Sequence, residues 1–140
     1  MDYTLSSEKA TFDFAKKFAS QLKGGEIIGL IGNLGAGKTV FSKGIAAGLK
    51  IKANITSPTF VIMKVYPVRH SNIKNICHID AYRLKSADDL AAIGAKDYFG
   101  EPDSITIVEW ADLVKKILPK KTIYVKITNK SEKERIINLK

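Results

Sequence analysis

Residues 32–39 read GNLGAGKT and satisfy every fixed position of the pattern G-x-x-x-x-G-K-[ST]. Glycines in such a loop let backbone N–H groups turn toward phosphate oxygens, where side chains would block the approach. Lys38 can then reach the phosphates, and the Thr39 hydroxyl can bind Mg²⁺. An apolar run at residues 27–31 precedes the octet and a helix-like run follows it, so the spacing predicts a phosphate-binding loop. The alternative is a glycine turn without a ligand.

A nucleotide site also needs a carboxylate to hold Mg²⁺, usually at the end of a second apolar strand. Glu109 directly follows the apolar or β-branched run at residues 105–108 and is the first candidate, although it could also be an ordinary residue at a strand end. The second candidate is Asp80. Alternation along a strand places His78, Asp80 and Tyr82 on one face, which we expect to be a solvent-exposed functional surface. A half-exposed hairpin face would look similar.

A third signal is the segment TSPTF at residues 56–60, between the loop helix and the next strand. P-loop proteins commonly carry a γ-phosphate sensor there. Thr59 could hydrogen-bond the γ-phosphate region or a water on Mg²⁺, with Pro58 restricting the turn.

The composition is that of a water-soluble chain. Its 140 residues fit one domain spanning residues 1–140, with 45% hydrophobic and 26% charged residues. We expect a cytoplasmic protein without a membrane partner, because the sequence has neither a signal peptide nor an apolar run of about 20 residues. A single cysteine, Cys77, excludes an internal disulfide and a cysteine-based metal cluster.

The formal net charge of +9 is concentrated near the end of the chain, where residues 115–140 contain nine basic and two acidic side chains. Such a stretch suggests a polyanionic partner. An ordinary solvated, lysine-rich surface would have the same composition.

Short apolar runs flanked by helical patterns predict an α/β fold. We expect a three-layer sandwich of the P-loop NTPase type, with a central mixed, largely parallel sheet and antiparallel hairpin strands. Ligands of such folds bind at the carboxyl ends of strands, where residues 32–39 and Glu109 lie. Helices are expected at residues 8–22, after the loop, through residues 86–93 and at 112–118, and strands at 26–31, 60–68, 73–82, 105–108, 122–128 and 134–139.

Four segments taken together resemble the bacterial TsaE (YjeE) ATPases. They are GNLGAGKT at residues 32–39, SPTF at 57–60, HIDAYRL at 78–84 and VEW at 108–110, in the family's order and at its usual spacing. The resemblance implies a P-loop ATPase, weak alone and activated by partners, that assists TsaB and TsaD in making threonylcarbamoyladenosine next to the anticodon of tRNA. ATP and Mg²⁺ are the implied ligands, with tRNA reached through the complex.

The resemblance also implies roles for single residues. Lys38 would contact the phosphates, Thr39 and Glu109 would hold Mg²⁺, and Asp80 would lie near the γ-phosphate. Thr11 matches a threonine near the adenine, and Arg135 falls where the family tends to carry a basic residue near the nucleotide. The remaining expected nucleotide contacts come from the loop and the start of its helix: Gly35, Ala36, Gly37 and Val40. Three residues depart from the family pattern: Asn33 for Asp, Val40 for a second Thr, and Ala81 for a larger apolar residue.

Three other classes of protein stay open. The segment NKSE at residues 129–132 approximates the guanine-reading N-K-x-D of a small GTPase, with Glu in place of Asp. A small-molecule kinase would normally carry an arginine-rich lid, whereas this chain has only Arg69, Arg83 and Arg135. A binding module gated by nucleotide, in which hydrolysis only resets a complex, is the third.

Overall fold

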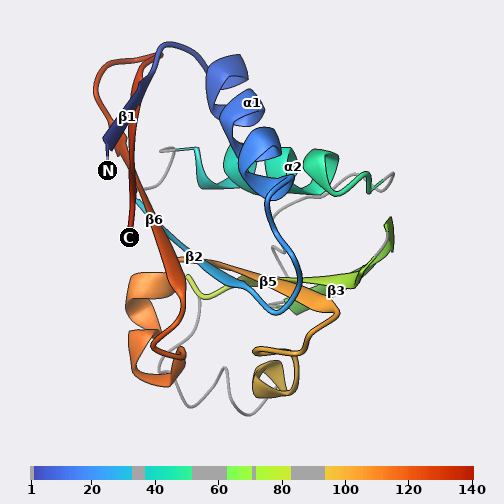
Figure 1. Ribbon diagram of the computed structural model, residues 1–140. Coiled ribbons are helices and arrows are strands. Elements are labelled where there is room, and N and C mark those ends of the chain that lie inside the picture. The colour runs from blue at the N-terminus through green and yellow to red at the C-terminus, as the bar shows by residue number, and fades with distance from the viewer. Residues whose placement is uncertain (1, 33–36, 52–62, 71, 83–93) are drawn as a thin grey trace.

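The computed structural model describes residues 2–32, 37–51, 63–70, 72–82 and 94–140. Within these residues, two α-helices and three short 3₁₀ turns accompany seven strands (Figure 1). The strands are β1 (Asp2–Leu5), β2 (Ile27–Ile31), β3 (Met63–His70), β4 (Ile73–Asp80), β5 (Ser104–Glu109), β6 (Ile123–Asn129) and β7 (Arg135–Leu139). The helices are α1 (Glu8–Ala19) and α2 (Lys38–Gly48), and the 3₁₀ turns are η1 (Ala95–Asp97), η2 (Ala111–Leu113) and η3 (Lys115–Ile117).

All seven strands join one sheet in the order β1-β7-β6-β2-β5-β4-β3. Strand β2 pairs in parallel with both β5 and β6, and β4 pairs in parallel with β5. The remaining pairs, β3 with β4, β6 with β7 and β1 with β7, are antiparallel. The expected mixed sheet, parallel in its centre with antiparallel hairpins at its edges, is confirmed.

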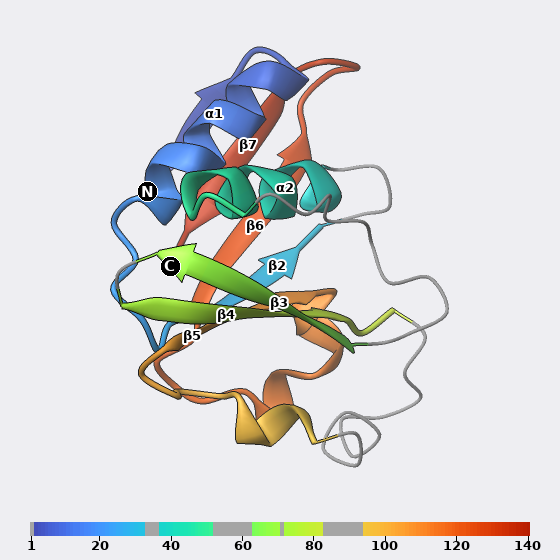
Figure 2. The ribbon, with the colours of Figure 1, turned by 90° about the vertical axis from the view of Figure 1, so that its right-hand side faces the viewer.

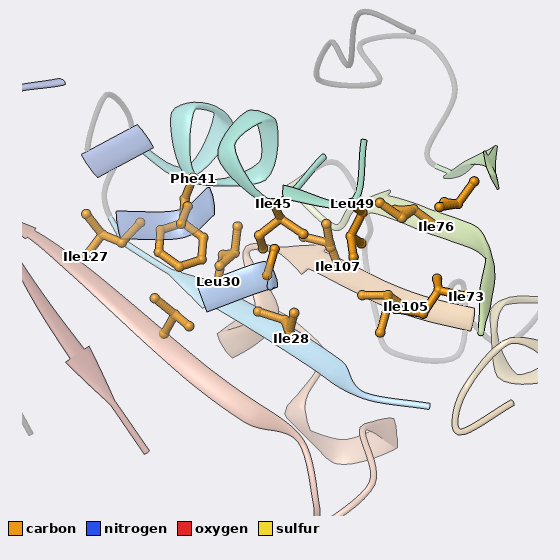
Figure 3. Close-up of a cluster of buried hydrophobic side chains, with 14 of the residues drawn as sticks. Ile28, Leu30, Phe41, Ile45, Leu49, Ile73, Ile76, Ile105, Ile107 and Ile127 are labelled. Carbon is orange, nitrogen blue, oxygen red and sulfur yellow. The ribbon is translucent and has the colours of Figure 1, made fainter. Parts of the chain in front are cut away.

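The two α-helices cover one face of this sheet (Figures 1 and 2). Alternate residues of the central strands, such as Ile28 and Leu30, point toward Phe41 and Ile45 of α2 and form the larger apolar core (Figure 3). The helices approach each other closely, because a Cβ atom on Gly44 would lie 2.6 Å from the Phe12 carbonyl oxygen of α1. Small residues therefore bring the two helix backbones together.

The opposite face is covered by the 3₁₀ turns and their connections (Figure 2). A second apolar cluster forms there from the other set of alternate strand residues, including Ile27, Cys77 and Val108. The helix expected at residues 112–118 is wrong, since this segment forms η2 and η3. Trp110 precedes it with a left-handed φ of 61°, and Val114, with a φ of −128° and a ψ of 20°, interrupts the helical backbone between the two turns.

Other boundaries differ from expectation by a few residues. Helix α1 ends at Ala19 rather than at residue 22, because the next two backbone N–H groups after its cap bond to carbonyls three residues back. Strand β1 was not expected, since four mostly polar residues give too little pattern, and it forms by pairing with the distant β7. The helix expected through residues 86–93 and the start of the strand expected at 60–68 lie outside the described residues. In the described part of the chain, no helix combines the length and the apolar character that a membrane span requires.

Candidate functional site

The carboxyl ends of three neighbouring strands bring the predicted polar residues to one edge of the sheet (Figure 2). Gly32 follows β2, Glu109 ends β5 and Asp80 ends β4. Glu109 is the register partner of both Leu30 and Asp80, because β5 lies between β2 and β4. Helix α2 starts at the same edge, where ligands of α/β sheets bind.

Gly37 and Lys38 make the turn into α2. Gly37 is the residue before the helix and has a φ of 107°, a left-handed conformation that favours glycine. Lys38 is only 5% exposed, and its Nζ donates to the Gly32 carbonyl oxygen at 2.6 Å, so its side chain closes the loop back onto the end of β2. Residues 33–36, including the predicted Gly35 and Ala36, lie outside the described residues.

The Lys38 ammonium has an unusual environment. Its Nζ lies 4.0 Å from the centre of the Trp110 ring, which is within the range of a cation–π contact. Burial lowers the pKa of Lys38, while the negative charges of Glu109, Asp80 and Asp112 act in the opposite direction. Burial and the Trp110 contact thus hold the Lys38 ammonium beside the loop, where it can bind an anionic ligand.

Glu109 connects the loop helix to strand β4. Its side chain is 2% exposed. One carboxylate oxygen, Oε1, lies 3.5 Å from the Thr39 hydroxyl, and the other, Oε2, lies 2.5 Å from Nε2 of His78. A hydroxyl and a carboxylate that converge in this way are oxygen ligands of the kind Mg²⁺ prefers.

Asp80 and Tyr82 extend the site outward from His78. The predicted alternation is confirmed for His78 and Asp80, because Cys77 and Ile79 belong to the cluster on the opposite face. Tyr82 lies in a turn, since β4 ends at Asp80 rather than at residue 82. The expectation that His78 lies on a solvent-exposed surface is wrong: its exposure is 0%, whereas Asp80 is half-buried and Tyr82 is 54% exposed. Burial raises the pKa of Asp80, and the Tyr82 N–H, which donates to Oδ1 at 3.0 Å, opposes this shift. The Tyr82 ring packs on Trp110 with centroids 4.8 Å apart.

A small pocket of about 80 Å³ lies beside the start of α2. Four of its lining residues were predicted to bind nucleotide, and they come from three elements: Thr11, Gly37, Val40 and Arg135. The fifth, Glu8, was not predicted. Two of these side chains are held by the backbone, since the Thr11 hydroxyl donates to the Ser7 carbonyl at 3.3 Å and Arg135 Nη1 donates to three carbonyls of the β6–β7 turn at 3.0 to 3.2 Å.

Sequence reasoning missed the roles of two residues and could not be tested on a third. Trp110 was expected only as part of a motif, whereas in the structure its ring contacts both Lys38 and Tyr82. His78 was treated as a surface residue, and only the parallel pairing of β4 with β5 shows that it meets Glu109. Thr59 lies outside the described residues.

Part of the basic stretch at residues 115–140 lines a groove. Three of its lysines, Lys115, Lys126 and Lys140, line an open groove of about 220 Å³ with Asp112 and Tyr124. Lys115 Nζ lies 5.0 Å from the centre of the Tyr124 ring. The groove adjoins a second one, of about 360 Å³, because both are lined by Ile31, Asp112 and Lys126, and the second reaches Gly32 and Trp110 of the site.

The family model of "Threonylcarbamoyl adenosine biosynthesis protein TsaE" matches residues 5–137 of this chain. The chain belongs to the TsaE family. Among its relatives, the TsaE protein of Rickettsia typhi is 35% identical over 139 residues, which cover 99% of this chain and 93% of the relative. The TsaE protein of Bacillus subtilis is 37% identical over 123 residues, 88% of this chain and 74% of the relative.

A solved structure resembles this TsaE-family chain in three dimensions as well. The crystal structure of Bacillus subtilis YdiB superposes with a TM-score of 0.78 at 32% sequence identity, covering 99% of this chain and 83% of that one. The α/β sheet is thus the fold of a solved relative, and the residues gathered at its edge are those that carried the resemblance in the sequence.

Proposed function

We propose that this TsaE-family chain binds and hydrolyses ATP with Mg²⁺ in the cytoplasm. We further propose that it does so as an accessory protein of the tRNA threonylcarbamoyladenosine modification complex, acting with TsaB and TsaD. The observation that carries the proposal is the convergence of Lys38, Thr39 and Glu109 where β2, β5 and α2 meet. Family membership supports the role in tRNA modification.

The residues fit such a ligand by their chemistry. Lys38 would hold the β- and γ-phosphates. Its buried ammonium is already directed at the loop, where it donates to the Gly32 carbonyl oxygen. Thr39 and Glu109 would supply oxygen ligands to Mg²⁺, and the ion would neutralise charge on the phosphate oxygens. Asp80, half-buried at the end of the next strand, would face the γ-phosphate side.

The residues of the small pocket beside α2 would contact part of the nucleoside. Thr11 and Val40 form two of its walls, and the Arg135 guanidinium lies near Gly37, with Nε 4.0 Å from where a Cβ on that residue would be. The Arg135 guanidinium, next to the amino end of α2, would then contact the phosphates that extend from the nucleoside. Loop residues Gly35 and Ala36, together with Thr59, remain proposed contacts from the motif alone.

The test is ATP turnover by the purified chain, measured alone and with TsaB, TsaD and tRNA, with GTP as the competing substrate. We expect weak ATP hydrolysis that rises with the partners, and no comparable turnover of GTP. Lys38→Ala should abolish hydrolysis, because it removes the cation that stabilises charge on the transferring phosphoryl group, while the circular dichroism spectrum stays unchanged. A folded Lys38→Ala variant with near-normal turnover would refute the assignment.

The two carboxylates can be separated by a Mg²⁺ titration. Glu109→Gln is nearly isosteric but removes the charge facing the cation, so higher Mg²⁺ concentrations should be needed for nucleotide binding. Asp80→Asn should instead slow hydrolysis more than binding. If extra Mg²⁺ restored Asp80→Asn but not Glu109→Gln, the two roles would be reversed.

A further inference from the structure

His78 is a polar residue that is fully buried, although it belongs neither to the phosphate loop nor to the apolar core clusters. It is 0% exposed, on the sheet face that packs under α2, and its Nε2 lies 2.5 Å from Oε2 of Glu109. In the described part of the chain its other ring nitrogen, Nδ1, has no hydrogen-bond partner. A buried imidazole is costly unless it makes good hydrogen bonds, so the contact with Glu109 is the main compensation for placing this ring here.

The contact fixes one oxygen of the carboxylate. A hydrogen bond to a carboxylate requires Nε2 to carry the proton, and this tautomer leaves only a lone pair, not an N–H group, without a partner at Nδ1. Glu109 Oε2 is thus occupied by His78, while Oε1 is turned to the Thr39 hydroxyl. The terminal torsion of a glutamate is broad, so a hydrogen bond to one oxygen narrows the orientations that the carboxylate can take.

We propose that His78 is a positioning residue for Glu109, which it holds through Nε2–H so that Oε1 stays directed at Thr39, where Mg²⁺ would bind. The inference rests on the proposed function, and it adds a residue that touches neither the nucleotide nor the metal. Hydrogen bonds from outside the ligand shell commonly orient metal-binding carboxylates, and losing one typically costs about 10- to 100-fold in metal affinity. Strand pairing explains why this residue can act, since β4 lies directly beside β5.

The decisive comparison is His78→Gln against His78→Met. The two side chains have nearly the same length and shape, but only Gln carries a nitrogen donor near the position of Nε2. Thr106→Val is the matched control. Thr106 is also fully buried, and its hydroxyl has no hydrogen-bond partner among the residues that the structure describes, but it lies on the opposite face of β5. The probe is Mg²⁺ itself, titrated at a fixed concentration of ATP, with ATP binding followed by calorimetry and folding by thermal melting.

We expect His78→Met to raise the Mg²⁺ concentration for half-maximal ATP binding about 10-fold or more. His78→Gln and Thr106→Val should stay within about three-fold of the unchanged protein, and ATP binding in EDTA should be similar in all four. The proposal is overturned if His78→Met keeps the normal Mg²⁺ requirement, or if His78→Gln is impaired as much as His78→Met. Should His78→Met fail to fold, His78→Asn takes its place, since its amide is one methylene too short to reach Oε2.

Failure of the proposed function would look different. In that case the unchanged protein itself would show no Mg²⁺-dependent binding of ATP. If the unchanged protein binds ATP in a Mg²⁺-dependent manner and His78→Met matches it, only the role of His78 is wrong.

Discussion

Cys77 gives a prediction that is independent of any ligand. The thiol is fully buried on β4, among the apolar side chains under the 3₁₀ turns, and burial raises its pKa from 9.0 to about 12. In the unfolded chain the thiol ionises at its ordinary, lower pKa, so the unfolded state gains stability first as the pH rises. The contribution of this group to folding is therefore fully present below about pH 9 and is lost between about pH 9 and 12.

The size of the effect follows from the two pKa values. Ionisation of the unfolded thiol alone should reduce the free energy of unfolding by about 2 kcal/mol between about pH 8 and about pH 10.5. Cys77→Ala removes this dependence but leaves a small cavity, which costs about 1 kcal/mol at every pH. The variant should thus be less stable than the unchanged protein at pH 8 and as stable or more stable at pH 10.5.

Urea unfolding of both proteins at the two pH values measures this change. Other groups also titrate in the alkaline range: burial lowers the pKa of Lys38 and raises the pKa of Tyr124. Both groups are present in both proteins, so their effects cancel in the comparison. If the difference in unfolding free energy between the two proteins is the same at both pH values, burial does not raise the pKa of the Cys77 thiol.

Three further predictions follow from packing, capping and charge. Gly44→Ala should lower the free energy of unfolding by about 2 kcal/mol, measured in urea, because the new Cβ would lie 2.6 Å from the Phe12 carbonyl oxygen, and a normal stability would contradict the close helix contact. Ser7→Ala should cost about 1 kcal/mol in the same assay, since the Ser7 hydroxyl accepts the Ala10 N–H at 3.0 Å as the cap of α1, and an unchanged midpoint would count against that cap. Replacing the three groove lysines by Gln should weaken salt-dependent binding of tRNA more than replacing three exposed lysines outside it, and equal effects would argue against the groove as the contact. The groove lysines are Lys115, Lys126 and Lys140, and the comparison set is Lys116, Lys120 and Lys121.

The parts of the fold that depend on local pattern could be predicted from the sequence. The apolar runs of β2 and β5 are buried on both faces of the sheet, and such strands are recognisable without knowledge of their neighbours. The loop and Glu109 could be placed at one edge, because parallel strands end together. The mixed character of the sheet followed from the hairpins at residues 63–80 and 123–139.

The parts that depend on distant contacts could not. Strand β1 forms by pairing with β7, at least 130 residues away, and the alternation along β4 does not show that His78 is fully buried. The turns η2 and η3 follow from the left-handed backbone at Trp110, a conformation that no local pattern of a bulky residue indicates. The His78–Glu109 contact depends on the pairing of β4 with β5 and on the rotamers of two side chains, and neither can be read from a local pattern.

Strand β2 is hydrogen-bonded on both edges, to β5 and to β6. Its amides donate alternately to the two neighbours, so the strand as a whole exchanges with solvent only through openings that separate both β5 and β6, which for a central strand is close to complete unfolding. A ligand held by the loop that follows this strand would slow that exchange by a factor of about 1 + [L]/Kd, where [L] is the concentration of free ligand. Deuterium uptake at Ile28, Gly29 and Leu30 would then report the occupancy of a site that none of these three amides needs to touch.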